Sequence, residues 1–211
     1  MKILFQGDSI TDCGRATCGG AGFETDSVGP GYPGLVKARI MCDNPGRDDI
    51  EFVNRAVSGN RIVDLYARWR ADALNLAPDV LSILVGVNDV WHEEWGNGVD
   101  APRADRIYRE IIAWTKQTLP AVRLVLLEPF ALPVGKGAEI AAEVARRAAA
   151  VRRMAEDTGS AFVPLQSIFD DACRASKPEH WSRDGVHLTP AGHQLVADAW
   201  LRAAPPVALI A

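Results

Sequence analysis

Short apolar runs alternate with longer amphipathic stretches along the whole chain. The short runs are typical of buried strands, and they cover residues 2–6, 50–54, 80–85, 123–128 and 161–164. The stretches between and after them repeat apolar residues at helical spacing, at residues 31–41, 62–76, 102–118, 138–158 and 190–203. Pro102 and Pro190 suit a first helical turn, and Thr189 suits the N-cap position before Pro190.

This alternation predicts the architecture. Strands that alternate with helices through short connections form βαβ units, so we expect a parallel sheet with helices on both faces. Five strands favour a flavodoxin-like, doubly wound sheet in a three-layer α/β/α fold. The chain has 211 residues and shows neither a linker nor an internal repeat, so we expect a single domain over residues 1–211.

Composition narrows the class of protein. Hydrophobic residues make up 48% and charged residues 24% of the chain, which are values of an ordinary globular protein. Because the net charge is −4, we expect neither a nucleic-acid partner nor an anionic membrane partner. The longest apolar stretch, residues 80–87, is too short to cross a bilayer.

Cysteine usage and the N-terminal residues bear on location and on metals. The four cysteines show no framework spacing and no CxxC pair, and we therefore expect free thiols at Cys13, Cys18, Cys42 and Cys173. The first residues show no signal-peptide pattern, which favours a cytoplasmic protein. No group of His, Cys and carboxylate residues has metal-ligand spacing, so we expect no metal and no cofactor.

Four polar blocks fall where predicted strands end or where the last predicted helix begins. They are GDSI at residues 7–10, SGN at 58–60, GVND at 86–89 and DGVH at 184–187. The carboxyl ends of parallel strands open on one edge of a sheet, where open α/β folds bind their ligands. We therefore expect the four blocks to converge there.

The blocks supply the parts of a serine-nucleophile site. A serine hydroxyl is a weak nucleophile that needs a base, usually a histidine oriented by a carboxylate. Ser9 provides the hydroxyl, His187 the base, and Asp184 the orienting carboxylate. The backbone N–H groups of Ser9 and Gly59 and the side-chain amide of Asn88 are candidate donors to an oxyanion.

In the identity and order of these blocks the chain resembles the SGNH hydrolases, also called the GDSL family. The resemblance covers nearly the whole chain, from Ser9 to His187. It implies an SGNH hydrolase fold and an esterase activity, with Ser9 as nucleophile and first oxyanion donor. It implies further that Gly59 and Asn88 are the other two donors, that Asp184 orients the base and that His187 is the base.

Further segments resemble bacterial SGNH esterases that remove acetyl groups from xylo-oligosaccharides. The segments are GYPGLV, NRAVSGN, GVNDVWH, EPFALPVG, FVPLQ and DGVHLTPAGH. This resemblance implies an acetylated sugar as substrate, an intracellular location and a homo-oligomer. The chain departs from it at Ile10, where the family name has leucine, and at Leu188, where many relatives have proline. The alternatives are a short-chain lipid esterase, lysophospholipase or thioesterase with the same site, and a non-catalytic carbohydrate-binding module.

Each block also has a structural interpretation. A serine after a strand commonly caps a helix, and asparagine or aspartate commonly bonds within its own turn, so these roles stay open for Ser9, Asn88 and Asp184. Among the histidines, His187 alone has a carboxylate three residues before it and a predicted helix directly after it. Its rivals are His92, His180 and His193, of which we expect the last on a helix face or in the core.

Residues beside the blocks are candidates for substrate contact. Trp91 and Trp181 each lie three residues from a block residue, where an indole face suits a sugar ring or an acyl pocket. Asp8 adjoins Ser9 and is a candidate for substrate contact, although its position favours anchoring the turn through backbone hydrogen bonds. Arg55 has two interpretations, substrate contact and a structural ion pair.

Two further segments bear on the surroundings of the site and on assembly. The irregular loop at residues 13–33 follows Ser9 and is expected to border the site. The uncharged tail at residues 205–211 packs either on its own domain or against a neighbouring subunit. Trp69, Trp114 and Trp200 fall in helical stretches, so we expect them in the core or at an interface.

Overall fold

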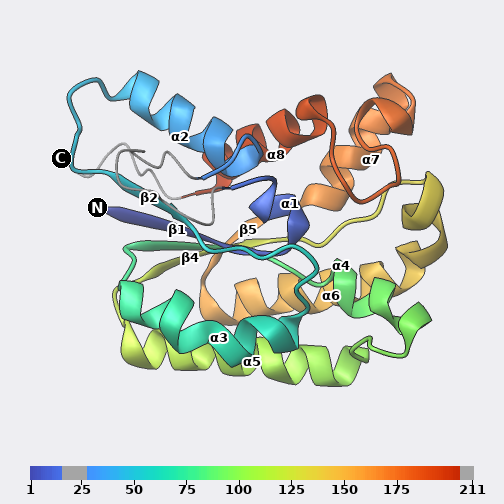
Figure 1. Ribbon diagram of the computed structural model, residues 1–211, viewed down its shortest axis with the longest axis horizontal. Helices are drawn as coiled ribbons and strands as arrows, with labels where there is room; N and C mark the ends of the chain where they lie inside the picture. Colours follow the sequence, from blue (N-terminus) through green and yellow to red (C-terminus); the bar gives the residue numbers. More distant parts are fainter. Residues whose placement is uncertain (16–27, 205–211) are drawn as a thin grey trace.

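A five-stranded parallel sheet forms the centre of the computed structural model, which describes residues 1–15 and 28–204 (Figure 1). The strands lie in the order β2-β1-β3-β4-β5. Their bounds are β1 (Lys2–Gly7), β2 (Glu51–Asn54), β3 (Val80–Leu84), β4 (Arg123–Leu127) and β5 (Ala161–Val163). The chain reverses its direction of travel across the sheet between β1 and β3, which creates a ligand-binding switch point at their carboxyl ends. The predicted doubly wound α/β fold is confirmed.

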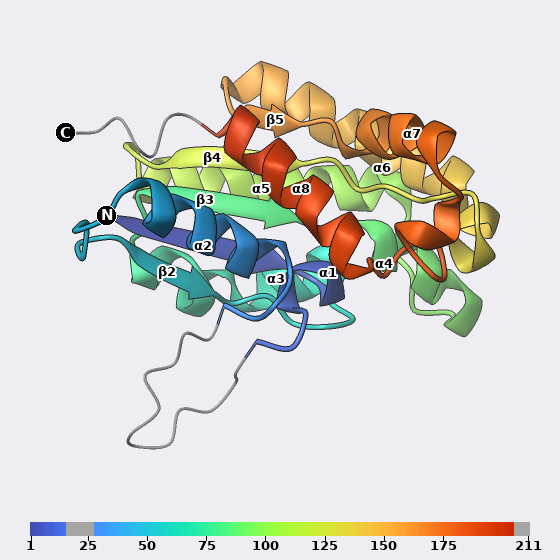
Figure 2. The ribbon, with the colours of Figure 1, turned by 90° about the horizontal axis from the view of Figure 1, so that it is seen from above.

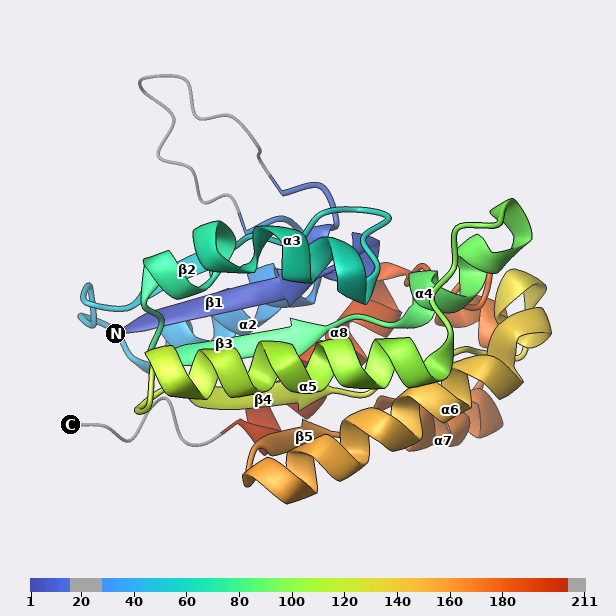
Figure 3. The ribbon, with the colours of Figure 1, turned by 90° about the horizontal axis from the view of Figure 1, so that it is seen from below.

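Helices cover both faces of this sheet. One face carries α3 (Ile62–Asp72), α5 (Ala101–Thr118) and α6 (Gly135–Thr158), as Figure 3 shows. The other face carries α2 (Tyr32–Asp43), α7 (Leu165–Ala175) and α8 (Pro190–Ala203), as Figure 2 shows. The shorter helices are α1 (Ser9–Asp12), α4 (Val87–Trp91), η1 (Leu74–Leu76), η2 (His92–Trp95) and η3 (Pro178–His180).

The central strand β3 shows why the sequence reads as a continuous apolar run there. Val80 and Leu84 belong to the core on the α2 and α8 side, whereas Leu81 and Ile83 belong to the core on the α3 and α5 side. Successive side chains of a strand point to opposite faces, so a strand covered on both faces is apolar apart from residues whose polar atoms are satisfied inside, as Ser82 is here.

Each of the two cores holds a fully buried tryptophan with a satisfied indole N–H. Trp200 in α8 donates to Ser82 Oγ at 3.0 Å, and Trp69 in α3 donates to Thr115 Oγ1 at 2.9 Å. Burying an indole without a partner for its N–H costs free energy, so these hydroxyls let both rings pack inside. The expectation that Trp69 and Trp200 are core residues is confirmed.

The predicted elements agree with the structure to within three residues at each end, except that the helix expected at 62–76 is divided into α3 and η1. The sequence analysis did not predict α1, α4 or α7. The first two are about one turn long, so they carry no periodic signal. Helix α7 does carry one, since Leu165, Ile168 and Phe169 follow helical spacing.

Some predictions concern residues outside the described ranges. Residues 16–27 of the 13–33 loop, which include Cys18, and the apolar tail at 205–211 lie outside them. Cys13, Cys42 and Cys173 are free thiols, as predicted. Within residues 1–15 and 28–204, no helix combines the length and the hydropathy that crossing a membrane requires.

Candidate active site

The polar blocks meet at the carboxyl edge of the sheet, where α1 and α4 follow the ends of β1 and β3 (Figures 1 and 2). Ser9 and His187 are 178 residues apart in sequence, yet Ser9 Oγ lies 2.9 Å from His187 Nε2. The fold therefore places a hydroxyl and an imidazole within hydrogen-bonding distance.

The turn that carries Ser9 is shaped by its neighbours. Gly7 ends β1 so close to β3 that a Cβ at this position would lie 2.3 Å from the carbonyl oxygen of Leu84. Asp8 is the N-cap of α1, and its carboxylate accepts the Ile10 N–H at 3.1 Å. Ser9 is the first residue of α1, where backbone N–H groups have no partner within the helix. Its N–H is thus available to a ligand.

Asp8 lies beneath this turn. Its side chain is 1% exposed, and burial raises the pKa of its carboxyl to about 7. This burial and the hydrogen bond from Ile10 N–H favour the anchoring of the turn over substrate contact, which are the two interpretations that the sequence left open.

The loop at 184–187, called here the base loop, is organised by the carboxylate of Asp184. Its Oδ2 lies 2.7 Å from His187 Nδ1, and its Oδ1 accepts the N–H groups of Val186 and His187 at 2.9 and 2.7 Å. Burial by itself would raise the pKa of Asp184, but these hydrogen bonds outweigh it and lower that pKa. An ionised Asp184 holds the proton of the imidazole on Nδ1, which leaves Nε2 free to accept from Ser9.

The base loop is bonded to the connection between β4 and α6 and to the first turn of α6. Gly185 O accepts the Leu132 N–H at 2.9 Å, and Asp184 O accepts the Gly137 N–H at 2.8 Å. The buried hydroxyl of Ser182 donates to His187 O at 2.8 Å. These bonds hold the backbone of the base loop, while the side chain of His187 is 51% exposed.

The turn at 57–60, called here the oxyanion turn, follows β2. Asn60 N–H donates to Val57 O at 3.1 Å, and Gly59 has φ +80° at the third position, which favours glycine. Asn88 in α4 donates one amide hydrogen to Asn60 O at 3.2 Å. A side-chain amide has two N–H donors, so the second one remains for a ligand.

The tryptophans predicted to contact substrate differ in their placement. The Trp91 ring lies 5.7 Å from the His187 ring, and its indole N–H donates to Glu94 Oε1 at 3.0 Å. Trp181 instead packs edge-on against His180 and donates to the Ala172 carbonyl of α7 at 3.1 Å. The structure brings Trp91 beside the base and directs the Trp181 indole towards α7.

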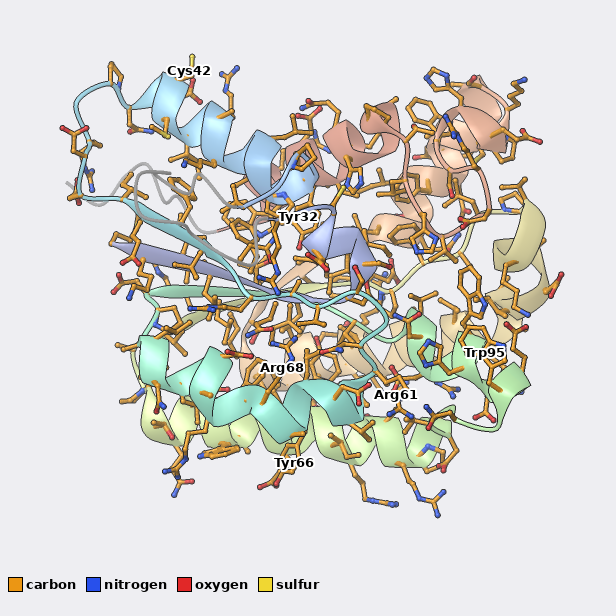
Figure 4. All side chains as sticks on the ribbon, viewed as in Figure 1. Tyr32, Cys42, Arg61, Tyr66, Arg68 and Trp95 are labelled. Atoms are coloured by element: carbon orange, nitrogen blue, oxygen red, sulfur yellow. The ribbon has the colours of Figure 1, made fainter. Side chains whose placement is uncertain are left out.

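Arg55 is exposed and forms no ion pair among the residues that the structure describes. Its carbonyl accepts a hydrogen bond from Arg68 of α3 at 2.7 Å. Figure 4 labels Arg68, together with Arg61 at the start of α3. Arg61, the N-cap of α3, donates to the Asn97 carbonyl, so Arg61 and Arg68 both bond to backbone oxygens of neighbouring segments.

The rival histidines occupy other settings. His193 is buried, accepts the Tyr32 N–H on Nδ1 at 3.2 Å, and burial lowers its pKa to about 4. The expectation that His193 lies in the core is confirmed. His92 packs against Trp95, with 4.9 Å between the ring centroids. The remaining rival, His180, packs against Trp181.

Two residues near the site were missed by the sequence analysis. Asp12 closes α1 and accepts two hydrogen bonds from Ser58 of the oxyanion turn. Its position three residues after Ser9, on the same short helix, was an available signal. Trp95 is 64% exposed beyond α4, where Figure 4 shows it. Its spacing of four residues from Trp91 was the corresponding signal there.

A cavity of about 400 Å³ lies between α5 and α6, and its lining includes Asp89, Tyr108 and Met154 but not Ser9 or His187. Asp89 follows Asn88 in α4, is fully buried, and accepts the Ile62 N–H at 3.2 Å with both oxygens. Burial raises the pKa of Asp89 to about 6. The Asp89 carboxylate therefore satisfies the first N–H of α3, and Asp89 also belongs to the lining of this cavity.

The arrangement suits nucleophilic attack on a carbonyl carbon. The contacts from Ser9 through His187 to Asp184 have the geometry that a nucleophile, its base and an orienting carboxylate require. The three predicted oxyanion donors belong to α1, the oxyanion turn and α4, which are joined by the hydrogen bonds of Asp12 to Ser58 and of Asn88 to Asn60. Within the described ranges, no group of three His, Cys or carboxylate residues is arranged to hold a metal ion.

Comparisons with known proteins agree on one family. The model of the GDSL-like Lipase/Acylhydrolase family matches residues 5–195. An acetylxylan esterase from Geobacillus stearothermophilus is 34% identical over 209 residues, which are 95% of this chain and 92% of that protein. The resemblance stated from the sequence blocks is therefore confirmed.

Solved structures show the same fold. Axe2, an acetylxylan esterase from Geobacillus stearothermophilus, superposes with a TM-score of 0.84 at 32% identity, covering 96% of this chain and 93% of that one. LAE5, an alpha/beta hydrolase enzyme from the metagenome of Lake Arreo, superposes with a TM-score of 0.85 at 32% identity, covering 96% and 94%. Catalytic mutants of Axe2 replace a serine, a histidine and an aspartate by alanine.

Proposed function

The chain belongs to the GDSL-like Lipase/Acylhydrolase family, and from this premise we propose that it is a serine esterase that removes acetyl groups from small carbohydrate esters. The family and the acetylxylan esterase relative already show a carboxylic ester hydrolase of the acetylesterase kind. The proposal adds the catalytic residues, the acyl-enzyme route and substrates of xylo-oligosaccharide size. It also takes residues 1–211 as a single catalytic domain.

Ser9 begins the proposed reaction. His187 Nε2 accepts the hydroxyl proton as Ser9 Oγ attacks the acetyl carbonyl, and Asp184 stabilises the imidazolium that forms. The carbonyl oxygen becomes an oxyanion, to which the N–H groups of Ser9 and Gly59 and the Asn88 amide donate.

The tetrahedral intermediate then collapses. The bond from the acetyl carbon to the sugar oxygen breaks, and His187 returns its proton to that oxygen, so the sugar leaves as an alcohol and the acetyl group stays on Ser9. A water molecule next takes the place of the Ser9 hydroxyl. Its oxygen attacks the acetyl carbon of the acyl-enzyme as His187 removes its proton. When this second tetrahedral intermediate collapses, the bond from the acetyl carbon to Ser9 Oγ breaks, His187 returns the proton to Ser9 Oγ, and acetate leaves.

One observation carries this proposal, namely the continuous contact from Ser9 Oγ to His187 Nε2 and from His187 Nδ1 to Asp184, at 2.9 and 2.7 Å. The catalytic mutants of Axe2 involve the same three residue types, which supports the assignment. The half-exposed His187 lies at an open edge of the fold, and this position suits a bulky sugar as leaving group. Trp91 beside His187 offers an aromatic face to it.

The decisive experiment follows acetate release by NMR from a panel of peracetylated mono- and oligosaccharides, with Ser9→Ala as the matched variant. We expect acetate release from the wild type and a loss of at least about 10³-fold in Ser9→Ala. A fluorophosphonate is expected to label the wild type and not the variant. Full activity of Ser9→Ala would contradict the mechanism.

A series of aryl esters from acetate to octanoate tests the substrate class. We expect the highest kcat/KM for acetate and a decline with acyl length, because the proposed selectivity lies in the sugar and not in a long acyl pocket. A rising series would favour the short-chain lipid esterase or thioesterase interpretation instead. Sugar binding without fluorophosphonate labelling would favour a carbohydrate-binding module.

Two properties accompany the proposal as predictions from the sequence resemblance: a cytoplasmic location and a homo-oligomer. Light scattering on the purified protein at several concentrations measures the second. A mass equal to one chain of 22.8 kDa at every concentration would contradict it.

A further inference from the structure

Asp12 joins the helix of the nucleophile to the turn that carries Gly59. Its Oδ2 accepts the Ser58 N–H at 2.9 Å and the Ser58 hydroxyl at 2.6 Å. The two residues are 46 positions apart in sequence and belong to different elements. One carboxylate oxygen therefore holds both donors of the residue that immediately precedes Gly59.

The carboxylate of Asp12 is itself held in place. Arg15 Nε lies 3.3 Å from Asp12 Oδ1, and the same nitrogen donates to the Ala56 carbonyl just before the oxyanion turn. Both side chains of this pair are largely buried, at 15% exposure for Asp12 and 12% for Arg15. Hydrogen bonds to an ionised acceptor are shorter and stronger than neutral ones, so this attachment is stiffer than a surface ion pair.

The peptide geometry connects Asp12 to the oxyanion donor. The N–H of Gly59 belongs to the peptide plane formed with Ser58, because a peptide bond is planar. Holding the N–H and the hydroxyl of Ser58 fixes one end of that residue, and the hydrogen bond from Asn60 N–H to Val57 O fixes the turn beyond it. The direction of the Gly59 N–H is then determined on both sides.

We propose that Asp12 is a positioning residue for catalysis, which aims the Gly59 N–H at the oxyanion by binding Ser58. The proposal rests on the proposed function, since it assumes that Gly59 donates to the oxyanion. Asp12 is the last residue of the helix that Ser9 begins, so one rigid turn of helix sets both the nucleophile and a donor. A displacement of Ser9 is transmitted to Gly59, which keeps their separation constant.

A second attachment lies on the opposite side of the turn. Asn88 donates to the Asn60 carbonyl at 3.2 Å, so the third donor residue is bonded to the residue that follows Gly59. Ser9, Gly59 and Asn88 are thereby linked into one unit through Asp12 and Asn60. Preorganised donors stabilise an oxyanion because they need no reorientation as charge develops.

The test measures kcat, KM and inhibition by a small alkylboronic acid for Asp12→Ala. The boronic acid forms a tetrahedral adduct on Ser9 that places an oxygen among the three donors. We expect kcat to fall by roughly 10- to 100-fold, because losing an oxyanion donor outright costs about 10²- to 10³-fold and here the donor is only misdirected. KM is expected to change by less than about threefold, and boronate affinity to weaken in parallel with kcat.

Three further variants sharpen the result. Asp12→Asn keeps an oxygen for the Ser58 N–H but loses the charge, so its kcat is expected between those of the wild type and Asp12→Ala. Ser58→Ala removes one of the two hydrogen bonds and is expected to lower kcat by roughly two- to fivefold. Asp43→Ala, at the end of α2 in an exposed ion pair with Arg39, is the matched control and is expected to leave kcat unchanged.

The outcomes separate this inference from the proposed function. Unchanged kcat in Asp12→Ala, together with an inactive Ser9→Ala, overturns the role of Asp12 and leaves the esterase mechanism standing. Activity in Ser9→Ala overturns the mechanism itself. A change confined to KM would mean that Asp12 acts on substrate binding, which also overturns the inference. If Asp12→Ala fails to unfold cooperatively, Asp12→Asn and Ser58→Ala decide, and wild-type kcat in both rejects the proposal.

Discussion

The base loop contacts Ser9 directly and the oxyanion turn is bonded to the helix that Ser9 begins, but the two are held in different ways. The base loop is bonded through its backbone to Leu132 of the β4–α6 connection and to Gly137 in the first turn of α6. The oxyanion turn has one backbone bond to β1, from the Val57 N–H to the Gly7 carbonyl at 3.1 Å. The residues on either side of Gly59 are instead bonded to the side chains of Asp12 and Asn88, which reach them from two helices. A backbone bond survives most substitutions, whereas a side-chain bond is lost with its residue. The base loop is therefore attached to the rest of the fold mainly by backbone bonds, and the residues that flank Gly59 mainly by individual side chains.

The buried carboxyl groups of the two regions also differ in the direction of their pKa shifts. Hydrogen bonds lower the pKa of Asp184 in the base loop despite its burial. Outside the base loop, burial raises the pKa of Asp8, which precedes Ser9, to about 7 and that of Asp89, which follows Asn88, to about 6. Ionisation of Asp184 therefore stabilises the folded protein, whereas ionisation of Asp8 or Asp89 destabilises it.

The largest expected effect comes from Asp184→Asn, which tests whether catalysis needs the charge of Asp184 while the conformation of the base loop does not. The amide oxygen of Asn keeps the hydrogen bonds from Val186 and His187 N–H, so the loop retains its geometry. The amide does not hold the proton on His187 Nδ1 or stabilise an imidazolium, so we expect kcat/KM to fall roughly 10³- to 10⁴-fold. Steady-state kinetics and a thermal unfolding curve check this.

For that variant the unfolding midpoint is the control. We expect it to shift by only a few degrees, because the backbone anchors at Leu132 and Gly137 do not involve the carboxylate. A large drop in midpoint alongside the loss of activity would mean that the loop depends on the charge of Asp184, and the contrast between the two regions would then be wrong.

Asn88→Ala is expected to have the next largest effect, on the oxyanion side. It removes one of the proposed oxyanion donors and also the hydrogen bond to the Asn60 carbonyl, so we expect kcat to fall roughly 10²- to 10³-fold with little change in KM. Combined with Asp12→Ala, the loss should be smaller than the product of the single losses, because both act on the same turn. Fully multiplicative losses in a double-mutant cycle would show that the two attachments are independent.

The same difference between the two regions explains which features of the fold and the site could be predicted from the sequence. The fold was predictable because β1 to β5 are apolar runs and the long helices have a clear period, as in residues 102–118. The relation of Asp184 to His187 was predictable because three residues separate them within one loop. Local spacing is sufficient for groups that one short segment arranges.

The attachments of the oxyanion turn could not be predicted in this way. The contact of Asp12 with Ser58 joins residues 46 positions apart, and no periodic pattern encodes which polar side chain meets which turn. Trp181 shows the same limit, since its spacing from Asp184 favoured the site while its indole N–H binds the Ala172 carbonyl of α7. That helix was itself not predicted, so the competing partner could not be weighed.

Asp8→Asn tests whether ionisation of the buried Asp8 carboxyl lowers the free energy of unfolding. Because the pKa of Asp8 is raised from its ordinary value near 4 to about 7, its contribution to stability is present below about pH 4 and is lost as the pH rises to 7. Asparagine stays neutral and keeps an oxygen for the Ile10 N–H. We expect the variant to gain unfolding free energy relative to the wild type between pH 4 and pH 8, by at most about 4 kcal/mol.

Urea unfolding at the two pH values measures this gain. Asp43→Asn at the surface end of α2 serves as the control and is expected to show no such pH-dependent difference. An Asp8→Asn protein whose stability relative to the wild type is the same at both pH values would show that Asp8 is not destabilised by ionisation.

Ser182→Ala is expected to have the smallest effect, and it tests the base loop where a side chain does contribute. The Ser182 hydroxyl donates to the His187 carbonyl at 2.8 Å, so its loss leaves that carbonyl without this donor and costs about 1 kcal/mol of stability. Catalysis should change by less than about threefold, since the bonds from Leu132 and Gly137 still hold the loop. Asp12→Ala removes a contact of similar length on the other side and is expected to cost at least about tenfold in kcat. Equal losses of kcat in these two variants would mean that side-chain anchors matter alike in both regions.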